Sequence, residues 1–224
     1  KYDAIVFYDM WVQGITPRQQ RAFVELLQQG IGVVALHHTL VAQENWPEYG
    51  EIIGGKYYLK DRVVDGKQVA KSAFAHDQDI PVRVAVADHA ITRGLQDFTI
   101  HDEAYCHYDV APAATVLLTT DHPKSDPELA WVKTYGNSRV CYIQLGHDHQ
   151  AYENPNYRLL VARAIRWVAG RPTDAAGPRI ELLNGTDLSG WIEEGKATWQ
   201  VEQGMLVGQQ GPGRAAGDLL TKEL

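Results

Sequence analysis

The first 36 residues carry a strand–helix–strand pattern that constrains the fold more than any other feature of the sequence. Short apolar runs over Ala4–Tyr8 and Gly32–Leu36 are typical of strands covered on both faces. Between them, Thr16 and Gln19 have the spacing of a capping box at the start of a helix. Gly30 supplies the left-handed residue that ends this helix. Strands joined through a helix pair in parallel, so we expect an α/β, flavodoxin-like parallel sheet with helices on both faces.

Further segments continue this pattern along the chain. Residues 57–79 are polar, and Asp65-Gly66 within them is a typical hairpin turn. Periodicity and apolar runs predict two more helices, over Trp46–Ile53 and Pro155–Ala169, and three more strands, over Val82–Val86, Thr115–Leu118 and Arg139–Leu145.

The composition changes after residue 170. Residues 1–170 are expected to form the α/β domain, and residues 171–178, which contain Pro, Gly and Ala, read as a linker. Residues 179–224 consist of short β-like pieces broken by glycine. A β domain of this length is marginal alone, so we interpret 179–224 as the truncated start of a larger β-rich domain. Because the chain opens directly on a buried strand, we also expect that residues are missing before Lys1.

Charge and cysteine content exclude several classes of protein. The formal net charge is −7 and no basic stripe is present, which argues against nucleic acid or an anionic membrane surface as a partner. No apolar run approaches the roughly 20 residues of a membrane-spanning helix, so we expect no membrane insertion. The two cysteines, Cys106 and Cys141, form neither a disulfide framework nor a zinc ribbon.

Polar side chains gather at predicted strand ends and in a neighbouring loop, where ligands bind in α/β sheets. His38 follows the second strand, His147 follows the strand over Arg139–Leu145, and Glu103 lies in a segment expected to be a loop. Imidazoles and carboxylates suit acid/base catalysis near neutral pH, so we predict these three as catalytic. They are also the candidate ligands of a divalent metal ion, although no cofactor follows with certainty. The alternative for each histidine is a structural hydrogen bond to the backbone.

A second set of residues lies beside these three in the sequence. Aromatic faces stack on sugar C–H surfaces, and polar neighbours give a pocket its specificity. Packing in the core is the alternative for the aromatic members. We expect His76, His89 and His122 to be solvated in turns. The predicted substrate-binding residues are His37, Trp46, Asp102, Tyr105 and His149.

Five separated segments carry a common pattern: Gly32–His38, Trp46–Tyr49 with Ile53–Gly55, Asp88–Leu95, Asp102–Tyr105 and Gln144–Asp148. They resemble the ThuA-like (trehalose utilisation) family, in that family's order and over roughly residues 1–170. The resemblance implies a class I glutamine-amidotransferase-like fold and a first strand before Lys1. After residue 178, Leu182–Trp191 and Trp199–Gly208 resemble the start of the 3-keto-disaccharide hydrolase family, which has a concanavalin-like β-sandwich.

Both resemblances imply a role in carbohydrate catabolism, with a small carbohydrate as the partner. We expect an enzyme that cleaves 3-keto-disaccharides or similar glycosides by acid/base chemistry, with a metal ion as an open addition. The alternative is a non-catalytic sugar-binding or scaffold domain that serves the attached sandwich. Amidotransferase chemistry is excluded, because the turn where it needs a cysteine nucleophile carries His37-His38. The domain combination favours a periplasmic or secreted location over a cytoplasmic one, and a homo-oligomer stays open.

Overall fold

The computed structural model describes residues 2–8, 14–174 and 183–222. The chain forms two compact units, Lys1–Asp174 and Ala175–Leu224. Residues 175–178 of the expected linker and the first residues of the expected β-rich segment, 179–182, lie outside the described residues. In the described part of the chain, no helix is long and apolar enough to cross a membrane.

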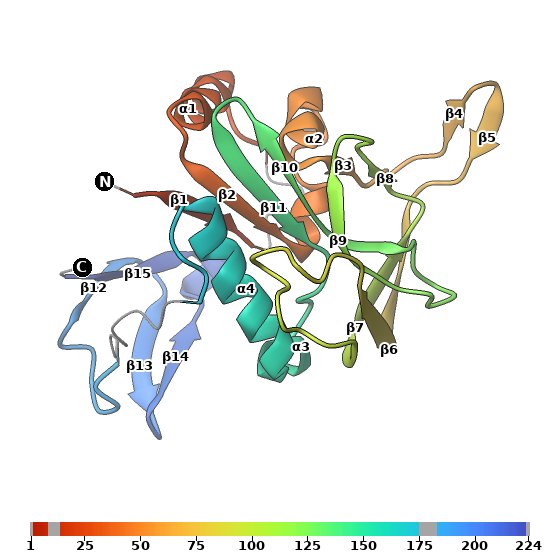
Figure 1. Ribbon diagram of the computed structural model, residues 1–224. Coiled ribbons are helices and arrows are strands. Elements are labelled where there is room, and N and C mark those ends of the chain that lie inside the picture. The colour runs from red at the N-terminus through yellow and green to blue at the C-terminus, as the bar shows by residue number, and fades with distance from the viewer. Residues whose placement is uncertain (1, 9–13, 175–182, 223–224) are drawn as a thin grey trace. The chain divides into compact units, whose positions relative to one another are not determined.

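A seven-stranded sheet organises the first unit (Figure 1). The strands β1, β2 and β11 pair in parallel, whereas β11, β10, β9, β6 and β7 pair antiparallel to one another. The α/β class is therefore confirmed, but the expected parallel pairing is limited to three strands. In spatial order the strands are β1 (Ala4–Phe7), β2 (Gly32–Leu36), β11 (Ser138–Ile143), β10 (Glu128–Tyr135), β9 (Thr115–Thr119), β6 (Ala73–Val84) and β7 (Phe98–Cys106).

Helices cover both faces of this sheet, as predicted. On one face, α1 (Pro17–Gln28) and α2 (Pro47–Ile53) share a hydrophobic cluster with alternate residues of β2, including Val33 and Ala35. On the other face, α4 (Pro155–Val168) packs on the intervening residues of β2 and crosses in front of the sheet in Figure 1. Every residue of β2 is buried. This double coverage explains why the strand is apolar throughout rather than alternating.

Local signals in the sequence set the ends of these helices. Thr16 and Gln19 form the expected capping box of α1. Gly54 ends α2 with a left-handed φ of 76°. Asn154 caps α4, and its side chain accepts hydrogen bonds from the N–H groups of the first turn. A short helix before it, α3 (His149–Glu153), was not expected; Asp148 caps it.

The central part of the chain contains more strand than the sequence predicted. β6 begins at Ala73, although a strand was expected only from Val82. β7 and β10 were not expected at all, and β7 contains the residues His101–Tyr105 that were predicted to lie in a loop. The second half of β7 is buried on both faces while carrying Asp102 and Glu103. Such a strand shows neither an alternation of apolar and polar residues nor a continuous apolar run. This explains why the sequence pattern predicted a loop there.

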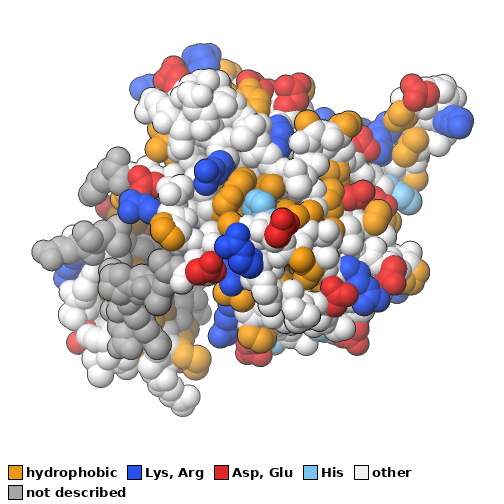
Figure 2. Space-filling model, viewed as in Figure 1, with side chains coloured by type: hydrophobic (Ala, Val, Ile, Leu, Met, Phe, Trp, Pro, Cys, Tyr) orange, Lys and Arg blue, Asp and Glu red, His pale blue; other side chains and the backbone are white. Residues whose placement is uncertain are grey.

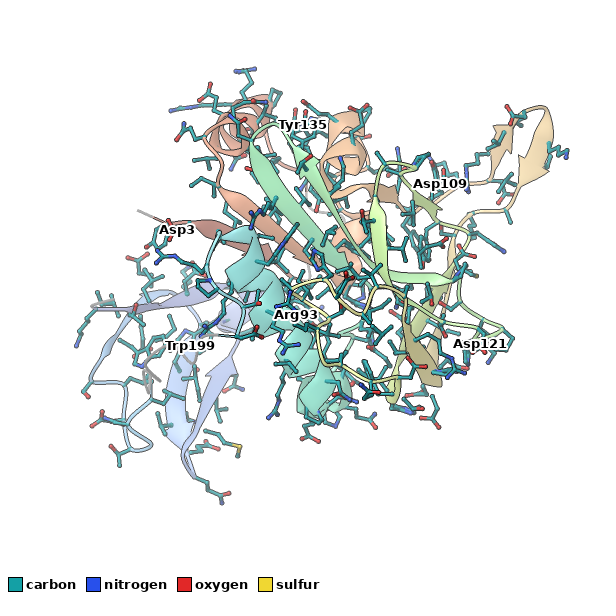
Figure 3. The ribbon with its side chains drawn as sticks, viewed as in Figure 1. Asp3, Arg93, Asp109, Asp121, Tyr135 and Trp199 are labelled. Carbon is teal, nitrogen blue, oxygen red and sulfur yellow. The ribbon has the colours of Figure 1, made fainter. Side chains whose placement is uncertain are left out.

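A hairpin projects from the first unit (Figure 1). It consists of β4 (Arg62–Val64) and β5 (Lys67–Val69), joined by the predicted turn at Asp65-Gly66, where both residues have positive φ. At its base, β3 (Gly55–Lys56) pairs with β8 (Asp109–Val110). Asp109, labelled in Figure 3, accepts hydrogen bonds from Arg62 at 2.9 Å and from Tyr58 at 2.6 Å. These bonds fix the base of the hairpin.

The second unit contains two separate two-stranded sheets. One pairs β12 (Trp191–Gly195) with β15 (Gly217–Thr221), and the other pairs β13 (Thr198–Glu202) with β14 (Met205–Gln209). A short 3-10 turn, η2 (Pro212–Arg214), precedes β15. The β-rich character agrees with the sequence pattern, and the identity of this unit as part of a β-sandwich stays a prediction. On the face shown in Figure 2, acidic and basic side chains are interspersed over the described surface.

Candidate active site

The site begins where β2 ends. His37 has a left-handed φ of 47°, which is uncommon for a residue other than glycine. The hydroxyl of Tyr142 donates a hydrogen bond of 2.9 Å to the His37 carbonyl and holds this conformation. The chain then continues into the 3-10 helix η1 (His37–Val41). Strained turns of this kind, directly after a strand, present functional side chains in other α/β enzymes. The strained residue is His37, whereas the sequence pattern had suggested His38 as the presented side chain.

The imidazole of His37 is completely buried and has four close partners. Its Nδ1 lies 2.6 Å from the carbonyl oxygen of Gln144, so this nitrogen carries the proton and donates it. Its Nε2 lies 3.0 Å from Oε2 of Glu103 and 2.9 Å from the hydroxyl of Tyr105. The same Nε2 lies 3.2 Å from Nδ1 of His147. His37 therefore forms the floor of the site and does not face solvent.

Glu103 lies at the centre of a ring of imidazoles. Besides His37, its carboxylate oxygens lie 3.3 Å from His147 Nδ1, 3.0 Å from His76 Nδ1 and 3.9 Å from His38 Nε2. The Glu103 side chain is almost fully buried, whereas about half of the His76 side chain is exposed. One buried carboxylate thus contacts four histidines. They come from the turn after β2, from β6 and from the loop after β11.

A bulge in β6 brings His76 to Glu103. Ala75 pairs with Ala104 and Gln78 pairs with Asp102, so two residues of β6, His76 and Asp77, stand opposite the single residue Glu103. Asp77 has a left-handed φ of 55° at this point. Bulges of this type redirect side chains beside active sites.

Asp102 has a structural task in the same region. Its carboxylate accepts hydrogen bonds from the backbone N–H groups of Gly146 at 2.7 Å, His147 at 2.9 Å and Glu103 at 2.8 Å. Burial raises the pKa of Asp102, and these three donors limit that rise. Because Asp102 is buried and these backbone donors occupy both of its oxygens, it positions the loop that carries His147 rather than facing a substrate.

The electrostatics of the site favour an ionised Glu103. Burial opposes its ionisation, but the hydrogen bond with His37 and the neighbouring His147 and His76 outweigh burial and lower the pKa of Glu103. Burial, followed by the negative charge of Glu103, raises the pKa of Tyr57 to about 12. Burial also raises the pKa of Tyr105. Both phenols therefore stay neutral and can donate hydrogen bonds at physiological pH.

A pocket of about 260 Å³ opens onto this cluster. Its polar groups are His38, His76 and Glu103, and its remaining walls are aromatic or aliphatic. Glu103 and Tyr105 come from β7, and Phe74 and His76 come from the facing strand β6. The apolar part of the lining consists of Val41, Tyr57, Leu59, Phe74 and Tyr105.

The structure brings together most of the residues predicted from the sequence. His38, Glu103 and His147 lie in one cluster, and His37, Asp102 and Tyr105 contact it or support it. His149 lies at the exposed start of α3, and no described contact joins it to the cluster.

Trp46 does not line the pocket. It is buried at the start of α2 against Phe23 and Tyr49, and its indole N–H donates to Glu48. Packing, the alternative considered for the aromatic residues, accounts for this position.

His76 is the residue that sequence reasoning missed. It was expected to be solvated in a turn, whereas it lies in β6 and its Nδ1 approaches Glu103. No local signal marks it, because only the pairing of β6 with β7 places it there. Cys141 lies within β11, fully buried, and burial raises the pKa of its thiol to about 12. It is therefore unsuited to act as the nucleophile of an amidotransferase.

The cluster also has the composition of a metal site. His37, His38, Glu103 and His147 each offer one ligand atom, and these four atoms all lie within 4.8 Å of one another. Three of them were candidate ligands from the sequence, and the buried His37 is the addition.

Solved structures of other proteins share this fold. A ThuA-like protein from Parabacteroides merdae is 22% identical at a TM-score of 0.66, over 79% of this chain and 74% of its own. A ThuA-like protein from Bacteroides uniformis is 21% identical at a TM-score of 0.59, over 77% and 73%. A β-galactosidase from Bacillus circulans sp. alkalophilus is 14% identical at a TM-score of 0.52, over 92% of this chain and 26% of its own. At these identities the likeness is one of fold.

Comparison with protein families gives a closer assignment. No curated protein matches the chain. The family model described as ThuA, trehalose utilisation, matches residues 1–168, which is about three quarters of the chain. It does not extend into the second unit. That description indicates a carbohydrate-related role. The chain belongs to the ThuA, or trehalose utilisation, family.

Proposed function

We propose that the first unit is an enzyme that cleaves 3-keto-disaccharides or related glycosides by proton transfer. The observation that carries this proposal is the shared pocket of His38, His76 and Glu103, in which groups able to move protons meet aromatic and aliphatic walls. Membership of the trehalose utilisation family supports the substrate class.

The shape and lining of the pocket suit a sugar ring. Its volume of about 260 Å³ lies just below the ~300–1,000 Å³ of typical small-ligand pockets, so one ring fits inside better than two. The faces of Tyr57 and Phe74 can cover the C–H surface of a sugar. The polar groups His38, His76 and Glu103 can orient a bound ring by hydrogen bonds.

The chemistry follows from the ketone. A carbonyl at C3 acidifies the proton at C2, and a base removes that proton to give an enolate. The enolate then re-forms the C3 carbonyl and a C1–C2 double bond, and the bond from C1 to the glycosidic oxygen breaks. The departing oxygen takes a proton from an acid, so one proton is accepted and one is donated in each cleavage.

The geometry assigns these roles to imidazoles. Because the pKa of Glu103 is lowered, Glu103 is a carboxylate that orients its neighbours rather than a general acid. His38 is the base in this proposal, since it lines the pocket beside Glu103. His76 is the acid: its Nδ1 faces Glu103, which leaves Nε2 for the substrate. His147 does not line this pocket; it contacts Glu103 and His37 within the cluster.

The test is turnover of a 3-keto-disaccharide by the wild type and by His38→Ala and His76→Gln variants. A general acid or base contributes about 10²–10⁴-fold in rate, so each variant should lose at least about 100-fold in kcat/KM with unchanged circular dichroism. His122→Ala is the matched control, because this partly buried histidine lies in the loop between β9 and β10. Glutamine should not be hydrolysed by any form.

Two outcomes contradict the proposal. Near-wild-type turnover by both histidine variants would show that the pocket is not where cleavage occurs. Binding of keto-sugars by a wild type that never cleaves them would instead support the non-catalytic sugar-binding alternative, for which the aromatic walls alone suffice.

A further inference from the structure

Three ligand atoms at the floor of the site form a small triangle. His37 Nε2 lies 3.0 Å from Glu103 Oε2, His147 Nδ1 lies 3.3 Å from the same oxygen, and the two nitrogens are 3.2 Å apart. All three edges are within hydrogen-bond distance. The triangle is also removed from bulk water, since His37 and Glu103 are buried and His147 is mostly covered.

Protons alone cannot satisfy this triangle. A hydrogen bond needs a donor and an acceptor, and three atoms cannot be divided into two kinds so that every pair is complementary. If both nitrogens carry protons, two donors face each other at 3.2 Å. If either nitrogen is deprotonated, its lone pair faces the carboxylate oxygen. With Glu103 as a carboxylate, which can only accept, every arrangement of protons therefore leaves one repulsive edge in a region of low dielectric, where such contacts are costly.

A proton on His37 Nε2 carries a further penalty. Nδ1 of His37 already donates to the carbonyl of Gln144 at 2.6 Å, so a second proton makes this fully buried ring a cation. When a metal ion replaces that proton, the neutral ring aims its Nε2 lone pair at the ion instead. Histidines that bind metals show this same arrangement, with the other ring nitrogen donating to a backbone carbonyl.

The remaining supports of the triangle are equally well placed. The side-chain amide of Gln144 donates to the backbone carbonyl of Glu103 at 2.6 Å. The carboxylate of Asp102 holds the backbone N–H of His147 at 2.9 Å. Each of the three corner residues is thus fixed by a neighbouring polar group, as the ligands of metal sites are.

We propose that His37 Nε2, Glu103 Oε2 and His147 Nδ1 bind one divalent transition-metal ion, with His38 Nε2 next to its open side. In a tetrahedral site with bonds of about 2.0–2.1 Å, ligand atoms lie roughly 3.3–3.4 Å apart. The edges of 3.0, 3.2 and 3.3 Å are close to this spacing. Two imidazoles and one carboxylate suit Zn²⁺, Co²⁺ or Mn²⁺ rather than Mg²⁺ or Ca²⁺, which prefer oxygen ligands.

The experiment titrates the full chain, first stripped with a chelator, with Zn²⁺ and with Co²⁺ in the absence of any sugar. One ion per chain should bind, and Co²⁺ should give the intense visible absorption of a site with fewer than six ligands. A hundredfold excess of Mg²⁺ should not displace either ion. Because no substrate is present, the result does not depend on the proposed cleavage reaction.

Variants locate the ion. His147→Gln and Glu103→Gln should weaken binding by more than about 100-fold, since loss of an outer supporting group alone costs 10–100-fold. Asp102→Asn should give that smaller loss. The matched control is His122→Gln, outside the site, which should bind as the wild type does. His76→Gln removes a partner of the other oxygen of Glu103, so it should give the smaller loss that Asp102→Asn gives.

The opposing interpretation is a buried His37–Glu103 ion pair that binds no metal. That interpretation is supported, and the proposal overturned, if the wild type binds Zn²⁺ and Co²⁺ no more tightly than His147→Gln does. The proposal is also overturned if His122→Gln loses as much metal affinity as His147→Gln. Circular dichroism of each variant shows whether it is folded. If Glu103→Gln does not fold, the partly exposed His147 still provides the decisive comparison.

Discussion

At the scale of single residues, the site depends on one strained position. His37 adopts a left-handed backbone conformation, which costs about 1–3 kcal/mol for a residue of this type. Tyr142 and Gln144 hold it from the neighbouring strand and loop. The strain directs the imidazole inward to Glu103 instead of outward to solvent, and it is this inward direction that creates the cluster.

The charge of Glu103 should be visible in the pH dependence of stability. The pKa of Glu103 in the folded protein is lowered below its ordinary value of about 4.5. Its stabilising contribution is therefore complete above pH ~4.5 and is lost as the pH falls through the lowered pKa. We expect Glu103→Gln to reduce the free energy of unfolding at pH 6, with a difference from the wild type that shrinks at pH 3.5, measured by urea denaturation without metal.

The control for this measurement is Glu25→Gln. Glu25 is an exposed residue of α1, so its substitution should change stability by less than about 0.5 kcal/mol at either pH. A difference between wild type and Glu103→Gln that stays constant or grows on acidification would contradict the lowered pKa.

At the scale of elements, the loop between β11 and α3 connects the site to helix α4. Gly146 lies in this loop with a φ of 115°, a conformation that side chains rarely adopt. A Cβ placed there would lie 2.2 Å from the hydroxyl of Tyr157 on α4. The close approach of helix and loop is possible only because residue 146 has no side chain.

Gly146→Ala should therefore destabilise the protein strongly. We expect backbone strain of about 1–2 kcal/mol plus overpacking of about 1–3 kcal/mol, measured by chemical denaturation. Gly94→Ala is the matched control, because Gly94 has a φ of 75° but no atom within 4 Å of its added Cβ. It should show the strain alone. Equal decreases in the free energy of unfolding of the two variants would mean that Tyr157 moves aside without an energetic cost.

The sequence predicted those elements whose signals are local. The capping box at Thr16, the left-handed Gly30 and the Asp65-Gly66 turn each depend on a few neighbouring residues, and all three are present in the structure. β10 and β7 were missed because their burial is decided by distant strands. Parallel pairing was predicted for more strands than show it. The local βαβ pattern carries no information about β10, β9, β6 and β7, which pair antiparallel.

The same distinction applies to the site. His38 and His147 could be found because they directly follow predicted strands. Glu103 was found by its neighbours in the sequence, although its strand was not recognised. His76 could not be found, because its position opposite Glu103 depends on a bulge within the pairing of β6 and β7. Trp46 shows the reverse error: proximity in sequence to a polar cluster does not bring a residue into the pocket.

At the scale of the whole molecule, the described residues of the candidate site lie in the first unit. Both hydrophobic cores and all the cluster residues lie within Lys1–Asp174. We expect a chain ending at Asp174 to unfold cooperatively, with a Tm within about 2 °C of the first transition of the longer chain, because less than 1 kcal/mol should be lost. Differential scanning calorimetry measures both.

A chain that ends at Glu153 is the contrasting case. It lacks α4, so Leu160, Ala164 and Val168 leave one core open. It should show no cooperative transition. If the chain ending at Asp174 behaves in the same way, the first unit is not an independent folding unit.

The cluster around Glu103 has a consequence for how the protein folds. Glu103 is separated from His37 by 66 residues, and His37 from His147 by 110. These side chains meet only after the sheet has closed, and closures over such separations are slow steps in folding. We expect the transition state to lack the completed cluster, because the cluster needs the end of β2, β7 and the loop after β11 in place together. An ion bound there would leave the folding rate unchanged and slow unfolding, so it would extend the lifetime of the native state.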